Sequence, residues 1–215
     1  MKIKKIMLII ITILCLAGCV NIKSLSYDEI LNTLSNKPKN ANTFKKGYQY
    51  YVPDGLSLND SGTNYAVLSS SDITYYLYVD MVSYINKNSK EYEIDNTLEY
   101  SKRINYDNKT GFVEIKLVEN NKYLIEIMYN YAKIELMVEE SLINKALINS
   151  ISILNSIEYN DTIIENIINS DKLNYTEENY ELFDEEKNNS NILNYIEEDE
   201  EKVEHEEIKD TDFIN

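Results

Sequence analysis

Histidine and cysteine are the side chains that most often serve as general bases, nucleophiles and zinc ligands, and this chain has one histidine and two cysteines. His205 lies in a strongly acidic run near the C-terminus, where we expect it to be solvated. Cys15 and Cys19 lie within or directly after an apolar N-terminal stretch. A Ser-His-Asp triad in the central region and a zinc site built from Cys and His are therefore both excluded, and we predict neither a metal nor another cofactor.

Carboxylates are the remaining groups that could perform acid–base chemistry. Glu91 and Glu93 form one such pair, but the surrounding charged residues favour a solvated loop. A glycoside hydrolase needs two carboxyl groups at a set distance on either side of a groove, and the sequence does not fix that distance. The chain has no tryptophan for stacking on sugars, although its 19 tyrosines could take that role. A hydrolase with paired carboxylates, acting in the cell envelope, is therefore the least favoured of the three functional hypotheses that we consider.

Cys19 is the residue for which the sequence indicates a definite reaction. Lys2, Lys4 and Lys5 precede the apolar run 6–16, which would rise only about 16 Å as a helix, too short to cross a bilayer. This is the pattern of a signal peptide. Its end, Leu16-Ala17-Gly18-Cys19, resembles the lipobox of bacterial lipoproteins at all four positions.

That resemblance implies that Cys19 receives a diacylglyceryl group and becomes the first residue of the mature chain after cleavage of residues 1–18. Two acyl chains anchor a protein stably to a bilayer. The resemblance therefore predicts a lipoprotein held at the outer face of the cell membrane. The chain has 20 lysines against the single Arg103, and Ile, Asn and Tyr are abundant. This composition indicates AT-rich coding in a low-GC, Gram-positive bacterium.

Charge divides the mature chain into two parts. Residues 19–160 are nearly balanced, whereas residues 161–215 contain 19 acidic residues and four lysines. An excess of acid disfavours nucleic acid as a partner, because its phosphates would be repelled. We predict a tether at 19–25, a domain at 26–160 and an acidic, mostly disordered tail at 161–215. Isoleucines 163, 164, 167 and 168 fit one helical face that could continue the domain.

Two interpretations of the tail stay open. Apolar clusters interrupt its acidic residues, namely Leu182 with Phe183, and then Ile192, Leu193, Tyr195 and Ile196. These clusters could be docking motifs that fold on a partner. Alternatively, the tail is a solvating segment that an anionic membrane repels.

Hydrophobic periodicity predicts an α+β fold, with an antiparallel sheet of about six to seven strands between an N-terminal helix and a closing C-terminal helix. Ser26 and Glu29 fit a capping box at the start of a helix over 26–36. The longest strand is expected at 72–86, with an exposed tyrosine patch, if one exists, on its even-numbered face. Residues 59–63 are expected to form a loop. The other predicted strands are 48–52, 65–69, 98–106, 113–117, 123–129, 132–138 and a short one at 156–159, and the closing helix begins after Glu139.

The segment Tyr48-Gln49-Tyr50-Tyr51-Val52-Pro53-Asp54-Gly55-Leu56 resembles the opening strand and proline turn of Mog1/PsbP-like domains. Leu147-Ile148-Asn149-Ser150-Ile151 is similar to the end of that fold, so the resemblance covers residues 26–159. Members of this fold are mostly binding or assembly factors, which implies a binding role by analogy.

Our first hypothesis is therefore a lipid-anchored, extracytoplasmic binding or assembly module without catalytic activity. Its domain would engage a protein or another cell-envelope partner, whose identity the sequence does not give, and its tail would modulate this binding. This hypothesis rests on the motif at Cys19, the missing catalytic residue types and the division of charge. The second is a lipoprotein that binds a small molecule or glycan in a pocket lined by tyrosines.

Overall fold

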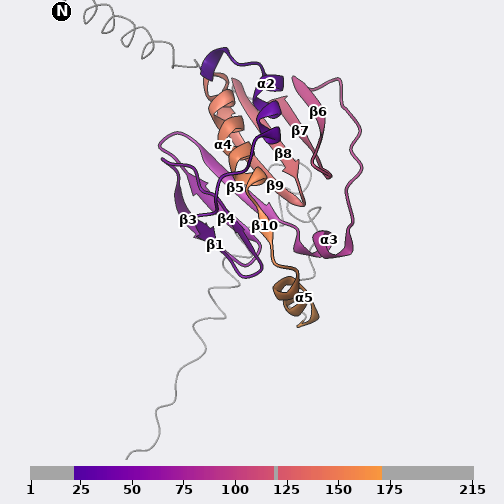
Figure 1. The fold of residues 1–215 in the computed structure, drawn as a ribbon. Helices are drawn as coiled ribbons and strands as arrows, with labels where there is room; N and C mark the ends of the chain where they lie inside the picture. The colour runs from indigo at the N-terminus through magenta and orange to yellow at the C-terminus, as the bar shows by residue number, and fades with distance from the viewer. Residues whose placement is uncertain (1–21, 119–120, 171–215) are drawn as a thin grey trace, which may run out of the picture.

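The computed structural model describes residues 22–118 and 121–170. The predicted signal peptide, Cys19, His205 and the tail from residue 171 onward lie outside the described residues. The described chain is α+β, as predicted (Figure 1). In chain order its elements are η1 (Ile22–Ser24), α2 (Tyr27–Leu31), η2 (Asn32–Ser35), β1 (Thr43–Phe44), β2 (Tyr48–Tyr50), β3 (Ser57–Ser61), β4 (Tyr65–Ser69), β5 (Thr74–Val79), α3 (Met81–Asn86), β6 (Tyr100–Tyr106), β7 (Lys109–Leu117), β8 (Lys122–Tyr129), β9 (Ala132–Glu139), η4 (Glu140–Leu142), α4 (Ile143–Asn155), β10 (Glu158–Tyr159) and α5 (Asp161–Asn169).

Seven antiparallel strands form the main sheet, in the order β3-β4-β5-β9-β8-β7-β6. Tight hairpins join β6 to β7 and β8 to β9. Asp107 and Asn108 at one turn, and Asn130 and Tyr131 at another, have positive φ angles, as two-residue hairpin turns require. A second sheet of β1, β2 and β10, which the sequence did not predict as a unit, joins the start of the domain to its end.

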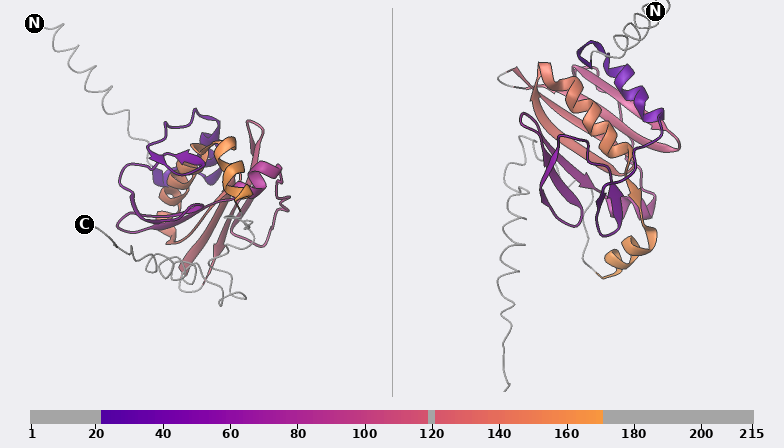
Figure 2. Two further views of the ribbon diagram at one scale, coloured as in Figure 1. Left: turned by 90° about the horizontal axis from the view of Figure 1, so that it is seen from below. Right: turned by 60° about the vertical axis from the view of Figure 1, so that its left-hand side comes forward.

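Helices α2 and α4 pack together and cover one face of the main sheet (Figure 2). The side chains that face them alternate along each strand, which is the two-residue period of a half-buried strand. Asn149 of α4 donates a hydrogen bond of 2.9 Å to the hydroxyl of Tyr75 on β5. The main core lies between these layers and includes Leu77, Ile127 and Ile134.

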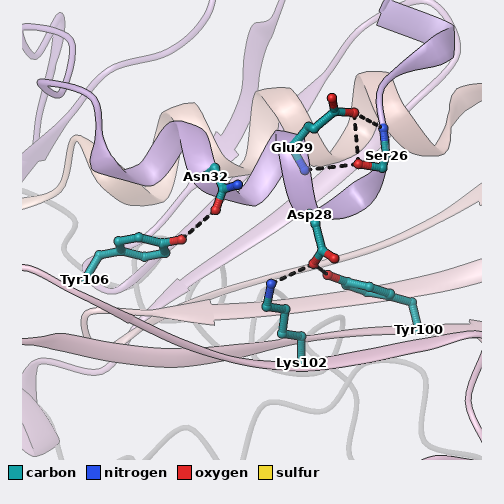
Figure 3. Close-up of polar contacts among 7 residues, drawn as sticks. All are labelled: Ser26, Asp28, Glu29, Asn32, Tyr100, Lys102 and Tyr106. Carbon is teal, nitrogen blue, oxygen red and sulfur yellow. Dashed lines mark hydrogen bonds and ion pairs between the residues drawn. The ribbon is translucent and has the colours of Figure 1, made fainter.

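The predicted capping box at the start of α2 is confirmed. Ser26 Oγ accepts a hydrogen bond from the backbone of Glu29, and the Glu29 carboxylate accepts one of 2.8 Å from the backbone of Ser26. On the side toward the sheet, Asp28 contacts both Lys102 and Tyr100 of β6 (Figure 3). These contacts fix the orientation of a helix of only five residues.

The long strand predicted at 72–86 is wrong in its second half. Strand β5 ends at Val79, and helix α3 follows it directly. Asp80 caps this helix by accepting a hydrogen bond of 2.8 Å from the backbone of Ser83. The predicted loop 59–63 is also partly wrong, because β3 continues to Ser61 by pairing with β4.

Helix α5 extends the packed core to residue 169, beyond the predicted domain end at 160. Asn160 caps the helix, and Ile164 and Ile167 are buried in the main core. The helix lies against α3 at one end of the sheet. No helix within the described residues is long and apolar enough to cross a membrane.

Candidate functional site

The chain enters the fold at Ile22, three residues after the predicted lipidation site Cys19. Asn144 at the start of α4 holds this entry by donating hydrogen bonds of 2.9 and 2.8 Å to the carbonyl oxygens of Ile22 and Leu25. Three residues extend at most about 11 Å. A lipid on Cys19 would therefore keep this end of the domain close to the membrane surface.

An open depression of about 570 Å³ adjoins the entry point. Its volume falls in the range of small-molecule sites. Its lining contains one tyrosine, Tyr27, whereas our second hypothesis required several. The depression is lined by Leu25, Ser26, Tyr27, Glu140, Ser141 and Asn144.

The opposite face of the main sheet holds the more unusual set of side chains. We call it the helix-free face, because no described helix lies over it (Figure 2). Strand register places Tyr76 of β5 opposite Glu135 of β9, Glu135 opposite Glu126 of β8, and Glu126 opposite Glu114 of β7. Directly paired residues share a face, so these four side chains form one row across the sheet.

A second row runs parallel to the first, one pleat closer to the α3 end. Its members are aromatic, cationic and thioether side chains. From β4 to β6 they are Tyr65, Tyr78, Lys133, Met128, Phe112 and Arg103. Tyrosine, methionine and arginine are the residue types enriched at protein interfaces.

The centre of the helix-free face is buried. Lys133 and Glu135 retain only 1% and 4% of their side-chain exposure, and their charged atoms are 3.9 Å apart. Tyr78 and Met128 beside them are 4% and 6% exposed. Transfer of charge out of water is expensive unless the charge is paired. The ion pair therefore lowers the cost of burying Lys133 and Glu135 on the central strand β9.

One edge of this face is closed by the connection between α3 and β6. The Tyr92 ring stacks on Phe112 with centroids 4.3 Å apart, and its hydroxyl donates a hydrogen bond of 2.7 Å to Glu114. The Arg103 guanidinium donates to the carbonyl oxygen of Tyr92. Burial, together with this hydrogen bond to a carboxylate, raises the pKa of Tyr92 to about 12. Tyr92, Phe112 and Met128 thus form a second small core, separate from the one under α4.

The carboxylates considered as catalytic candidates lie on the connection between α3 and β6. Glu91 and Glu93 flank Tyr92 in the chain, and both are exposed, as expected for a charged loop. In the residues that the structure describes, no group of three or more His, Cys, Asp or Glu side chains is placed to hold a metal ion. The glutamates of the first row therefore do not converge on one ion.

The exposed tyrosine patch expected on the even-numbered face of 72–86 is not there. Tyr76 is half-buried, Tyr78 is buried, and Tyr84 belongs to α3. Tyr84 instead stacks on Tyr159 at 3.8 Å between ring centroids and meets Tyr131 edge-on at 5.7 Å. This cluster lies at the end of the sheet beside α5.

No known protein family matches the chain, and a search of curated proteins found no similar sequence.

Proposed function

We propose that this protein is a lipid-anchored, extracytoplasmic binding or assembly module, attached to the outer face of the cell membrane through Cys19. We further propose that its helix-free face binds a protein of the cell envelope. The observation that carries the second statement is the row of side chains that surrounds the buried pair Lys133 and Glu135, namely Tyr65, Tyr78, Met128, Phe112 and Arg103. Aromatic side chains, methionine and arginine are the residue types that are enriched at protein interfaces.

The geometry of the entry point supports this arrangement. Ile22 and Leu25 are fixed to the start of α4, so a lipid on Cys19 would be joined to the domain by a very short tether. The strands run between the entry end and the α3 end of the sheet, and β7 runs toward the entry end, where Leu117 pairs with Tyr123 and Tyr123 pairs with Val138. The helix-free face would then stand to the side of the anchor, where another envelope protein could reach it.

The test is site-specific photo-crosslinking in cells with the full-length chain. A photoreactive amino acid replaces Tyr76 on the helix-free face, or Phe44 on the small sheet as the control, since Phe44 is an aromatic residue that is already exposed. We expect one protein to be crosslinked from position 76 and not from position 44. Crosslinking at neither position, or equally at both, would reject the proposed surface.

The anchor is tested separately with Cys19→Ala. We expect the unaltered chain to remain with the membrane fraction after a high-salt wash, because acyl chains are not released by salt. The variant should keep its uncleaved apolar signal, and metabolic labelling with a fatty acid should fail in it alone. Equal labelling of the two proteins would contradict lipidation at Cys19.

A further inference from the structure

The centre of the helix-free face is buried as deeply as the side of the main sheet that the helices cover, although no described helix lies over it. On the helix side, α4 accounts for the burial of Tyr75 and Ile134. On the helix-free face, Lys133 is equally inaccessible. The described connection through Tyr92 covers Phe112 on β7, but Lys133 lies on β9, two strands further into the sheet.

Burial of this kind requires other atoms to lie over the Lys133 side chain. Lysine is almost never fully buried, and its long side chain ordinarily keeps the ammonium group in water even where the stem is covered. Lys133 and Glu135 could both extend into solvent from an open sheet. Their exclusion from water therefore indicates that another segment lies over β9 and β5.

We propose that the chain's own C-terminal segment, residues 171–215, occupies the helix-free face. The described chain ends at Ser170, directly after α5, and α5 lies against α3. Helix α3 follows Val79, which pairs with Ala132 at the start of β9. The segment thus starts at the end of the sheet where the row of Tyr78 and Lys133 lies.

The length of the segment is sufficient. Seven strands spaced about 4.8 Å apart span about 29 Å. The segment has 45 residues. A helix of about 20 of them would already be about 30 Å long, so even a partly helical segment could cross the whole face.

The composition of the segment also fits the surface. Its apolar clusters, at Leu182 with Phe183 and at 192–196, can pack on Met128 and Phe112. Between them lie acidic residues, 17 in the segment against four lysines. The face carries Lys133 and Arg103 as well as its row of glutamates, so unlike an anionic membrane it does not present one sign of charge.

The consequence, which rests on the proposed function, is regulation by competition. A partner that binds this face has to displace residues 171–215. The acidic segment would then act as an internal competitor that sets the affinity for the partner, since a site that is only partly available binds more weakly in proportion.

Thiol labelling tests the cover. The full mature chain is made with Cys19→Ser, which leaves no other cysteine because Cys15 lies in the signal. Single cysteines are then introduced by Met128→Cys on the helix-free face, by Leu117→Cys at an exposed position, and by Ile127→Cys under α4. Each is labelled with a maleimide, alone and combined with four substitutions, Leu182→Asp, Phe183→Asp, Ile192→Asp and Ile196→Asp.

We expect the cysteine at 128 to react at least about tenfold more slowly than the one at 117 in the unaltered segment, because buried thiols are inert. It should approach the rate at 117 when the four apolar residues are replaced. The cysteine at 127 should stay slow throughout, which shows that the main core remains folded. Fast labelling at 128 in the unaltered chain, or equal protection with and without the substitutions, would overturn the proposal. Protection that increases with protein concentration would place a second copy on the face and overturn it as well.

A second measurement leaves the apolar clusters intact. A spin label attached through Asp184→Cys should broaden the methyl signals of Met128 and Met137 on the helix-free face, and full-intensity signals would reject the proposal. The two proposals fail separately. Fast labelling at 128 together with a specific crosslink from position 76 rejects only the cover by residues 171–215. Slow labelling without any crosslink rejects only the partner.

Discussion

Lys133 Nζ lies 3.9 Å from Glu135 Oε2, on the same face of β9 and two positions apart in the chain. The pair occupies the middle strand of the seven, at the greatest distance from either sheet edge. A pair that is held out of water in this way is sensitive to the loss of one member, because the buried charge of the other then loses its ion-pair partner.

Replacement of one charge should therefore cost more than replacement of both. We expect Lys133→Met to lower the free energy of unfolding by about 3 kcal/mol or more. The double variant Lys133→Met/Glu135→Leu should recover most of that loss, since apolar side chains of similar volume can replace a buried ion pair. Urea unfolding of the two variants and the unaltered protein measures both values. A single substitution that costs less than the double one would contradict this account.

The buried tyrosines should make the folded state less stable at alkaline pH. Burial is the main cause that raises the pKa of Tyr50, Tyr84, Tyr92 and Tyr129 to about 12 in the folded chain. The unfolded chain releases these protons near pH 10. Between pH 10 and 12 the folded state thus binds more protons than the unfolded state, so stability is complete below pH 10 and falls as the pH rises toward 12.

This loss can be followed by ultraviolet absorbance of tyrosinate together with circular dichroism. We expect one group of tyrosines to ionise near pH 10 with the fold intact, and a second group to ionise only as the secondary structure is lost. A single ionisation step near pH 10 in a protein that stays folded would show that these hydroxyls are not protected.

The alternation of the strands could be predicted because it depends on local pattern. Ile134, Leu136 and Val138 occupy alternate positions of the predicted strand 132–138, and all three are buried in the main core. The end of β5 could not be predicted in the same way. Tyr84 and Ile85 continue the strand-forming composition past Val79, but β9 begins at Ala132, so the pairing partner ends there and the Asp80 cap starts a helix instead. The end of β5 therefore depends on Ala132, which lies 53 residues after Val79 in the chain.

The rows on the helix-free face depend on register across several hairpins, which single segments do not encode. Glu114 and Lys116 alternate with apolar residues in the predicted strand 113–117, but this local pattern does not show that Glu114 lines up with Glu126 and Glu135. Nor did it show that Lys133 would be buried. The similarity to Mog1/PsbP-like domains and the lipidation of Cys19 stay predictions.

The attachment of α2 to the sheet should depend on acid pH. Hydrogen bonds from Lys102 and Tyr100 lower the pKa of Asp28. The contribution of ionised Asp28 to the stability of the folded state is then complete above the ordinary pKa of an aspartate, about 4. It is lost as the pH falls through the lower pKa that Asp28 has in the folded chain. Because the pair is exposed, the effect is small, and Asp28→Asn should lower the melting temperature by about 2 °C at pH 7.

At pH 2 the two proteins should melt at nearly the same temperature, because Asp28 is then largely neutral in the unaltered protein too. Lys102→Met serves as the companion variant and should reproduce the effect at pH 7. A difference between Asp28→Asn and the unaltered protein that is constant from pH 2 to pH 7 would assign the loss to packing and not to charge.

Two glycines form a matched pair that tests whether α5 is an integral part of the domain. Gly47 and Gly55 both have positive φ angles, of 101° and 85°. A Cβ at Gly47 would lie 2.9 Å from Cγ1 of Ile164 on α5 and 3.2 Å from the sulfur of Met81, whereas a Cβ at Gly55 would meet nothing within 4 Å. Gly55→Ala therefore adds backbone strain alone, about 1 kcal/mol, and Gly47→Ala adds a clash of about 1–3 kcal/mol to a similar strain. Thermal unfolding should give a much lower melting temperature for Gly47→Ala than for Gly55→Ala.

Truncation of Ile164 by Ile164→Ala in the Gly47→Ala background should cost less stability than Ile164→Ala does in the unaltered protein, because the shortened side chain leaves room for the added methyl group. Equal effects of the two glycine substitutions would mean that α5 is not held against Gly47, and the domain would then end near residue 160 as its charge pattern first indicated.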